Sequence, residues 1–189
     1  MFLSEHRSKE LLSQYGLAIP DGRMARSAAE AEQRAGDIGA RKFVVKAQIP
    51  AGGRGLAGGV RFAATPSLVG EEAGRMIGST LVTEQTGEAG EPVDSVYVEA
   101  AIDIARSVFI AISFDPVSGA PILLASAQGG VEFEQRARMD EDTVRTHPFA
   151  PDSPAARTAL TDFLAGLGID AAAIDTHALV FEHFGHLGR

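Results

Sequence analysis

Residues 46–60 read Lys46-Ala47-Gln48-Ile49-Pro50-Ala51-Gly52-Gly53-Arg54-Gly55-Leu56-Ala57-Gly58-Gly59-Val60. Five of the eight positions from Gly52 to Gly59 are glycine, so the backbone lacks Cβ atoms there and its N–H groups can approach a ligand closely. Successive N–H groups in such turns form a concave site for anions. Arg54 lies at the centre of this stretch and Lys46 precedes it. The stretch therefore predicts a phosphate-binding loop.

The residues on either side of the loop have the composition of strands. Residues 43–48 are β-rich, and strand alternation places Phe43, Val45 and Ala47 on one face and Val44, Lys46 and Gln48 on the other. The apolar face is expected in the core, with Lys46 directed to the site. Residues 60–63 predict a returning strand, so the pattern indicates a strand–loop–strand flap over phosphates.

Other glycine-loop motifs fit this setting less well. Residues 53–58 match G-x-G-x-x-G, but a dinucleotide fingerprint needs a helix directly after the glycines. A Walker loop needs Lys and then Ser or Thr after its last glycine, and a kinase carries its lysine downstream of the loop. Neither is present here. The remaining alternative is a mobile glycine loop that binds nothing, with Lys46 as an ordinary strand-edge lysine.

The rest of the chain mixes helical and strand-like segments, which favours an α+β fold over a doubly wound sheet. The patterns predict helices over residues 3–15, 31–38, 65–77 and 174–184 and from Ser153-Pro154, strands over 81–83 and 96–100, loops over 19–22 and 87–92, and a hairpin of 107–114 with 122–126. Ser27 and Thr65 are the expected helix N-caps.

Charge and composition exclude several classes of protein. The net charge of −8 argues against a general nucleic-acid or acidic-membrane binder, which needs a basic surface, but not against binding of one nucleotide. The chain has no cysteine, and therefore no disulfide, thiolate nucleophile or Cys-ligated metal. No apolar run approaches the roughly 18 residues that span a bilayer. We expect a soluble, cytoplasmic protein without a membrane partner.

Two further groups of residues were weighed as sites. His183 and His186 are three residues apart on a predicted helix and could form a metal-binding face, with His177 nearby. No third ligand lies at a suitable spacing along the chain. Glu132 and Glu134 alternate on a predicted strand, where a solvated face is the simpler reading. We assign no metal ligand and no catalytic residue to this chain.

Several motifs together resemble the β subunits of succinyl-CoA synthetase, within the ATP-grasp acid–CoA ligases. Beside the loop, the similar segments occur in the family's order: Glu5-His6 with Ser8-Lys9-Glu10-Leu11-Leu12, Leu81-Val82-Thr83 with Gln85-Thr86, Val98-Glu99-Ala100-Ala101 with Asp103-Ile104-Ala105, and Gly129-Gly130-Val131-Glu132. The resemblance covers the chain to about residue 138 and is more specific than the loop alone.

The resemblance implies an ATP-grasp fold with two lobes, incomplete at the C-terminal end. Residues 21–99 would form the lobe with the glycine loop, and residues 1–20 with 100–189 part of the second lobe. Lys46 and the backbone of Gly53, Arg54 and Gly55 would contact phosphates. Glu99 and the backbone near Ile102 would lie on the adenine and ribose side of the nucleotide.

The resemblance also implies a reaction and a partner. In the family, ATP phosphorylates a histidine of a partner α subunit, the phosphoryl group passes to a carboxylic acid, and CoA displaces phosphate to give the acyl-CoA. The implied cofactors are ATP and Mg²⁺, with GTP left open as the nucleotide, and the implied setting is the tricarboxylic acid cycle. The catalytic histidine is not expected in this chain.

The sequence departs from the family pattern at several positions. The family usually has Lys at Leu56, Glu at Ser107 and Glu at Gln128. Its Mg²⁺ ligands come from a downstream Glu-x-Asn-Pro strand and a later Asp, whereas this sequence contains no asparagine. We therefore expect this chain alone to be catalytically incomplete, either as a fragment of a longer subunit or as a natural short protein. Two alternatives stay open: a nucleotide-binding or interaction module without catalysis, and an ATP-grasp ligase with another acyl-phosphate product.

Overall fold

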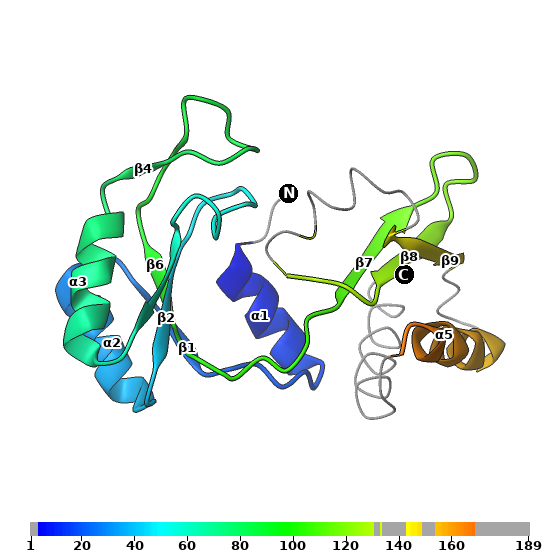
Figure 1. The fold of residues 1–189 in the computed structure, drawn as a ribbon, viewed down its shortest axis with the longest axis horizontal. Helices are drawn as coiled ribbons and strands as arrows, with labels where there is room; N and C mark the ends of the chain where they lie inside the picture. The colour runs from blue at the N-terminus through cyan, green and yellow to red at the C-terminus, as the bar shows by residue number, and fades with distance from the viewer. Residues whose placement is uncertain (1–3, 131–132, 134–142, 149–153, 169–189) are drawn as a thin grey trace. The chain divides into compact units, whose positions relative to one another are not determined.

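The computed structural model describes residues 4–130, 133, 143–148 and 154–168. They group into two compact units: the first holds the residues up to 13 together with Ala18–Asp103, and the second holds Gln14–Leu17 together with the residues from Ile104 onward. Figure 1 labels their helices and strands. Strands and helices are mixed in both units, as the α+β prediction requires. The lobe boundaries expected from the sequence stay a prediction.

The first unit is built on a four-stranded antiparallel sheet. Its strands are β1 (Gly22–Ala25), β2 (Phe43–Ala47), β3 (Val60–Ala63) and β6 (Val96–Ala100), in the spatial order β1-β6-β2-β3. The register between the two central strands pairs Lys46 with Tyr97 and Val44 with Glu99. A short ribbon of β4 (Thr80–Leu81) and β5 (Glu91–Pro92) lies outside this sheet.

Helices α2 (Ala28–Ile38) and α3 (Pro66–Met76) belong to this unit, as does α1 (Glu5–Gln14) except for its last residue. The two predicted N-caps are confirmed, because the Ser27 side chain accepts the N–H of Glu30 and the Thr65 side chain accepts the N–H of Leu68. Helix α2 ends at Gly39, whose φ of 66° is the left-handed conformation of a helix C-cap. These local signals fix the ends of α2 and α3.

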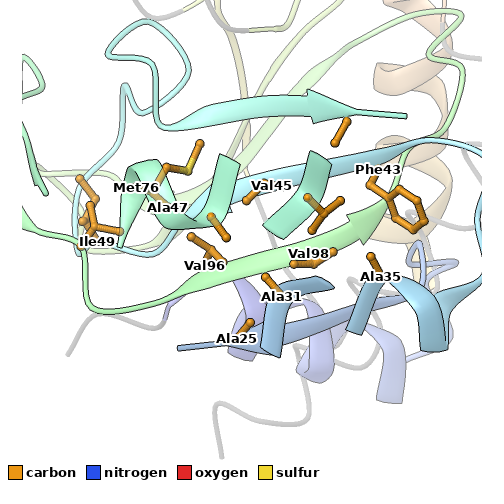
Figure 2. Packing of buried hydrophobic residues seen from close by; sticks show 14 residues of the cluster. Ala25, Ala31, Ala35, Phe43, Val45, Ala47, Ile49, Met76, Val96 and Val98 are labelled. Atoms are coloured by element: carbon orange, nitrogen blue, oxygen red, sulfur yellow. The ribbon is translucent and has the colours of Figure 1, made fainter. Parts of the chain in front are cut away.

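The core of the first unit lies between one face of the sheet and the helices α2 and α3 (Figures 1 and 2). Strand β2 contributes Phe43, Val45 and Ala47, and strand β6 contributes Val96 and Val98. The helices contribute three alanines, one valine and one methionine, namely Ala31, Ala35, Ala73, Val69 and Met76. The strand alternation predicted for residues 43–48 is therefore confirmed, and it places Lys46 on the opposite face of the sheet.

The second unit has a separate sheet and core. Strands β7 (Phe109–Phe114), β8 (Pro121–Ser126) and β9 (Arg145–Pro148) form an antiparallel sheet, and α5 (Pro154–Gly166) packs against it through Leu160 and Leu164. The Arg106 guanidinium donates to the carbonyls of Leu167 and Gly168, just past the C-terminal end of α5. The predicted hairpin around residues 115–119 and the helix from Pro154 are confirmed.

Four short strands differ from the sequence prediction. Strands β1 and β9 were not predicted, and the strand expected over residues 81–83 is limited to Thr80–Leu81. The loop expected over residues 87–92 contains β5. Each of these strands has two to four residues, so it exists through pairing with a neighbour rather than through its own propensity. Some of the predicted features lie outside the described residues, namely the helix over 174–184, the histidines His177, His183 and His186, and the carboxylates Glu132 and Glu134.

Candidate functional site

The polar face of the first unit's sheet carries the residues that the sequence singled out. Lys46 on β2 and Glu99 on β6 lie on the face opposite the core, because their neighbours Val45 and Val98 are in the core. Helix α1 lies on this side of the sheet (Figure 1) and reaches both residues through ion pairs. The site is therefore built from alternate positions of two central strands and from one helix.

Lys46 is held between two carboxylates. Its Nζ donates to Oε1 of Glu5 at 3.0 Å and to Oε1 of Glu99 at 3.1 Å. Burial alone would lower the pKa of Lys46, but attraction to Glu5 and Glu99 outweighs that effect and raises the pKa above its usual value. Lys46 is thus a firmly protonated cation on the polar face.

Arg54 of the glycine loop contacts the same helix residue. Its Nη2 donates to Oε2 of Glu5 at 2.8 Å, and its Nη1 donates to the carbonyl of Ala47 at 2.7 Å. The Glu5 carboxylate therefore bridges Lys46 and Arg54, one oxygen to each cation. Burial would raise the pKa of Glu5, but the attraction of Lys46, Lys9 and Arg54 lowers it to about 2.

Lys9 joins the two carboxylates from the other side. Its Nζ lies 3.1 Å from Oε1 of Glu5, donates to Oε2 of Glu99, and sits 5.4 Å from the centroid of the Tyr97 ring. Glu99 is only 5% exposed, so its charge requires these partners. We call Glu5, Lys9, Lys46, Arg54 and Glu99 the charged cluster: three cations and two carboxylates.

The glycine loop is closed by its own hydrogen bonds. The Ala47 N–H donates to the Gly59 carbonyl at 2.8 Å, and the Gly59 N–H donates to the Arg54 carbonyl at 2.7 Å. A Cβ at Gly59 would lie 2.5 Å from Cδ2 of Leu81 and 3.2 Å from that carbonyl oxygen, so a larger residue there would force its neighbours to shift. Gly53 has a φ of 74°, which also favours glycine.

Three consecutive N–H groups of this loop have no hydrogen-bond acceptor in the described part of the chain. Among the described residues, none accepts a hydrogen bond from the N–H of Gly53, Arg54 or Gly55. The Gly52 N–H, in contrast, donates to the Gln85 side chain at 2.8 Å. Consecutive N–H groups without a partner, next to the Arg54 guanidinium, have the chemistry of an anion site.

A large open cavity of about 1210 Å³ borders the loop within the first unit. It is lined by Glu5 and His6 of α1, by Pro50, Gly52 and Arg54 of the loop, and by Tyr97 of β6. Five arginines and three carboxylates line it, which gives its wall an excess of positive charge. Lys46 and Glu99 do not line it, and both form ion pairs with residues of α1.

The described residues do not form a metal centre. No group of three or more His, Cys, Asp or Glu side chains among them could hold a metal ion. The charged cluster has only two carboxylates, and each one is already shared by two or more cations. None of the described helices is long and apolar enough to cross a membrane.

The structure brings most of the predicted site residues together. Lys46, Arg54 and Glu99 belong to the charged cluster, and Gly53 and Gly55 flank Arg54 in the loop. Ile102 is 61% exposed, follows β6, and has no place in the cluster. The nucleotide contacts expected for these residues stay predictions.

Two members of the charged cluster received no role from the sequence. The sequence places Glu5 and Lys9 in the opening helix and predicts no contact for either. Their spacing of four residues places them on one helix face, which is the available signal. That signal does not identify their partners, because Lys46 lies 41 positions from Glu5 and Glu99 lies 90 positions from Lys9.

The chain is similar to curated succinate–CoA ligases. It is 40% identical over 174 residues to the ADP-forming succinate–CoA ligase subunit beta of Pelobacter propionicus, covering 89% of this chain and 43% of the relative. For the same subunit of Wolinella succinogenes the identity is 45% over 138 residues, covering 73% and 35%. For Acidiphilium cryptum it is 37% over 187 residues, covering 94% and 47%. The resemblance predicted from the sequence is confirmed, and the chain spans less than half the length of these relatives.

Solved structures and a family comparison extend this result. Acetyl-coenzyme A synthetase 1 of Ca. Korarchaeum cryptofilum matches with a TM-score of 0.68 at 22% identity, covering 98% of this chain and 80% of that one. ATP citrate lyase of Methanothrix soehngenii matches with a TM-score of 0.61 at 20% identity, covering 100% and 43%. At these identities the likeness concerns the fold. The ATP-grasp domain family matches residues 2–187, nearly the whole chain, and the chain therefore belongs to that family.

Proposed function

We propose that this chain is the ATP-binding part of the β subunit of an ADP-forming acid–CoA ligase of the succinate–CoA ligase type. One observation carries the proposal: Lys46 and Arg54 converge on one carboxylate, and three consecutive N–H groups of the glycine loop that carries Arg54 have no acceptor among the described residues. The whole enzyme would convert ATP, a carboxylic acid and CoA to acyl-CoA, ADP and phosphate. A histidine of a partner α subunit would carry the phosphoryl group from ATP to the carboxylic acid.

Each residue has a binding task in this proposal. Lys46 and Arg54 would neutralise phosphate charge, and the N–H groups of Gly53 and Gly55 would donate to phosphate oxygens. Glu99 would accept hydrogen bonds from ribose hydroxyls, and the backbone near Ile102 would face the adenine. Positioning and charge neutralisation are the main contributions of protein to phosphoryl transfer.

Magnesium is the part of the family's chemistry that the described residues do not fit. They offer no cluster of three metal-ligating side chains, and the carboxylates of the charged cluster are engaged by cations. In the proposal these residues bind and orient the nucleotide, and the metal ligands and the histidine come from elsewhere in the assembly. The Ca. Korarchaeum cryptofilum synthetase was itself solved with a phosphorylated phosphohistidine segment.

Calorimetric titration of the full chain with ATP, ADP and GTP in the presence of Mg²⁺ tests the proposal. Saturable binding is expected, and Lys46→Ala should weaken it by about tenfold, roughly 1.4 kcal/mol. Lys42→Ala removes an exposed lysine just before the same strand and should leave the dissociation constant within about twofold. Equal effects of the two substitutions would contradict the proposal. So would absence of binding at millimolar nucleotide both by the unchanged chain and by Glu5→Gln, which removes the carboxylate that holds Lys46 and Arg54.

A second candidate function is a nucleotide-binding module without catalysis. The lack of a metal-ligating cluster among the described residues favours it. The two functions separate when the chain replaces the matching part of the Pelobacter propionicus subunit beta, so that the rest of that subunit is supplied, and CoA thioester formation is measured with its α subunit, ATP, succinate and CoA. Turnover supports the ligase, whereas tight nucleotide binding without any turnover supports the module.

A further inference from the structure

The phosphate-binding cations of the proposed site already hold an anion. Glu5 of α1 places one carboxylate oxygen 3.0 Å from Nζ of Lys46 and the other 2.8 Å from Nη2 of Arg54. Lys9 lies 3.1 Å from the same carboxylate. Three cations thus surround one carboxylate, as they would surround a phosphoryl group.

A phosphate cannot take both cations while Glu5 keeps them. Lys46 already donates to Glu5 and to Glu99, and Arg54 already donates to Glu5 and to the Ala47 carbonyl. A phosphate oxygen between Lys46 and Arg54 would occupy the same space as the Glu5 oxygens, with repulsion between like charges. Binding at these two cations therefore requires Glu5 to leave.

Helix α1 is attached in a way that permits this departure. None of its residues is buried, and Glu5 belongs to its first turn. The described contacts of Glu5 with the sheet and loop are ion pairs, not core packing. Such contacts exchange with an incoming anion more readily than buried apolar surface separates.

We propose that Glu5 is an internal competitor for the nucleotide phosphate: its carboxylate occupies the phosphate position between Lys46 and Arg54 until a nucleotide displaces it. The inference rests on the proposed function and adds a residue that sets the affinity. It opposes the reading in which Glu5 orients Lys46 for the nucleotide. The two readings differ in sign, since removing a competitor tightens binding and removing an orienting group weakens it.

The test is calorimetric titration of ADP with Mg²⁺ into the full chain, Glu5→Gln and Glu71→Gln. Glu5→Gln should lower the dissociation constant by about tenfold at low salt. Glu71→Gln removes an equal charge from an exposed position on α3 and should change it by less than about twofold. The gain for Glu5→Gln should shrink as salt is raised, because the displaced ion pairs are screened.

The outcomes are separable. If the unchanged chain binds ADP and Glu5→Gln binds equally or more weakly, the competitor inference is wrong and the proposed function stands. If neither binds, the proposed function fails and the inference with it. Binding by Glu5→Gln alone supports both, with a competitor strong enough to block the site.

A second measurement does not depend on a variant binding. In the chain without nucleotide, a carbon NMR titration should show the Glu5 carboxylate remaining ionised from pH 6 to pH 4. With saturating ADP, the released carboxylate should take up a proton over that range, because its pKa returns towards the ordinary value of 4.5. An unchanged titration in the presence of bound ADP would overturn the inference.

Discussion

The two faces of the four-stranded sheet in the first unit are made from alternate residues of the same strands. On one face Phe43, Val45 and Val98 are buried against α2 and α3. On the other face Lys46 and Glu99 form ion pairs with α1. A shift of one residue separates the part of the strand that stabilises the unit from the part that offers charges to a ligand. Substitutions on the two faces should therefore have separable effects.

The largest effect should come from opening the apolar face. Phe43→Ala removes a side chain that is 1% exposed and should lower the free energy of unfolding by about 3–5 kcal/mol. Urea unfolding of the full chain measures this. The matched control is Phe62→Ala on the edge strand β3, where the ring is 75% exposed and the loss should stay within about 0.5 kcal/mol. Equal losses at the two positions would break the comparison of faces.

The polar face should contribute stability that depends on pH. The folded-state pKa of Glu5 is lowered to about 2 from 4.5, so its contribution is complete above 4.5 and is lost as the pH falls towards 2. The shift corresponds to about 3 kcal/mol. Urea unfolding between pH 3 and pH 6 should show the chain and Glu5→Gln converging as the pH falls. A stability difference independent of pH would mean that Glu5 acts through packing.

A smaller effect on binding should come from the loop cation. Arg54→Ala should weaken ADP binding by about fivefold, roughly 1 kcal/mol, because one of the two cations proposed to neutralise the phosphates, Lys46 and Arg54, is lost. Arg54→Lys keeps the charge but loses the second guanidinium nitrogen, which donates to the Ala47 carbonyl. Its affinity for ADP should lie between those of the unchanged chain and Arg54→Ala. Calorimetry decides, and an Arg54→Ala chain with unchanged affinity would remove Arg54 from the site.

The smallest effect should come from adding a charge to the loop. Leu56 is 55% exposed and stands where the resembling β subunits usually have lysine. Leu56→Lys should tighten ADP binding by about two- to threefold, roughly 0.5 kcal/mol, with no change in melting temperature. Leu56→Gln, similar in polarity without the charge, is the control. Weaker binding by the lysine variant would show that the loop has no room for another cation.

Local patterns in the sequence predict much of the fold. The alternation of residues 43–48 gives both faces of β2, and Ser27, Thr65 and Pro66 mark the starts of α2 and α3. These signals act over a few residues, so they can be read without tertiary information. Strands β1 and β9 could not be found this way, because four residues each acquire strand geometry only by pairing with β6 and β8.

The candidate site divides along the same line. Lys46, Arg54 and the glycines were predicted from one continuous stretch, and Glu99 from the resemblance. Glu5 was not, because its partners are 41 and 49 residues away and only the folded chain brings them together. Sequence reasoning thus finds the groups that attract an anion, and the structure adds the group that competes with it.

The closed glycine loop has a consequence for the thermodynamics of ligand binding. The hydrogen bond from the Ala47 N–H to the Gly59 carbonyl joins the two ends of the loop, and the bond from the Gly59 N–H to the Arg54 carbonyl holds its turn. Ordering a free backbone costs about 1–2 kcal/mol per residue, and glycines lose the most freedom. Here folding has already restricted the loop, so the binding of an anion does not have to include the cost of ordering it. The loop's hydrogen-bond enthalpy is then available for affinity instead of being cancelled by the entropy of closing a flexible segment.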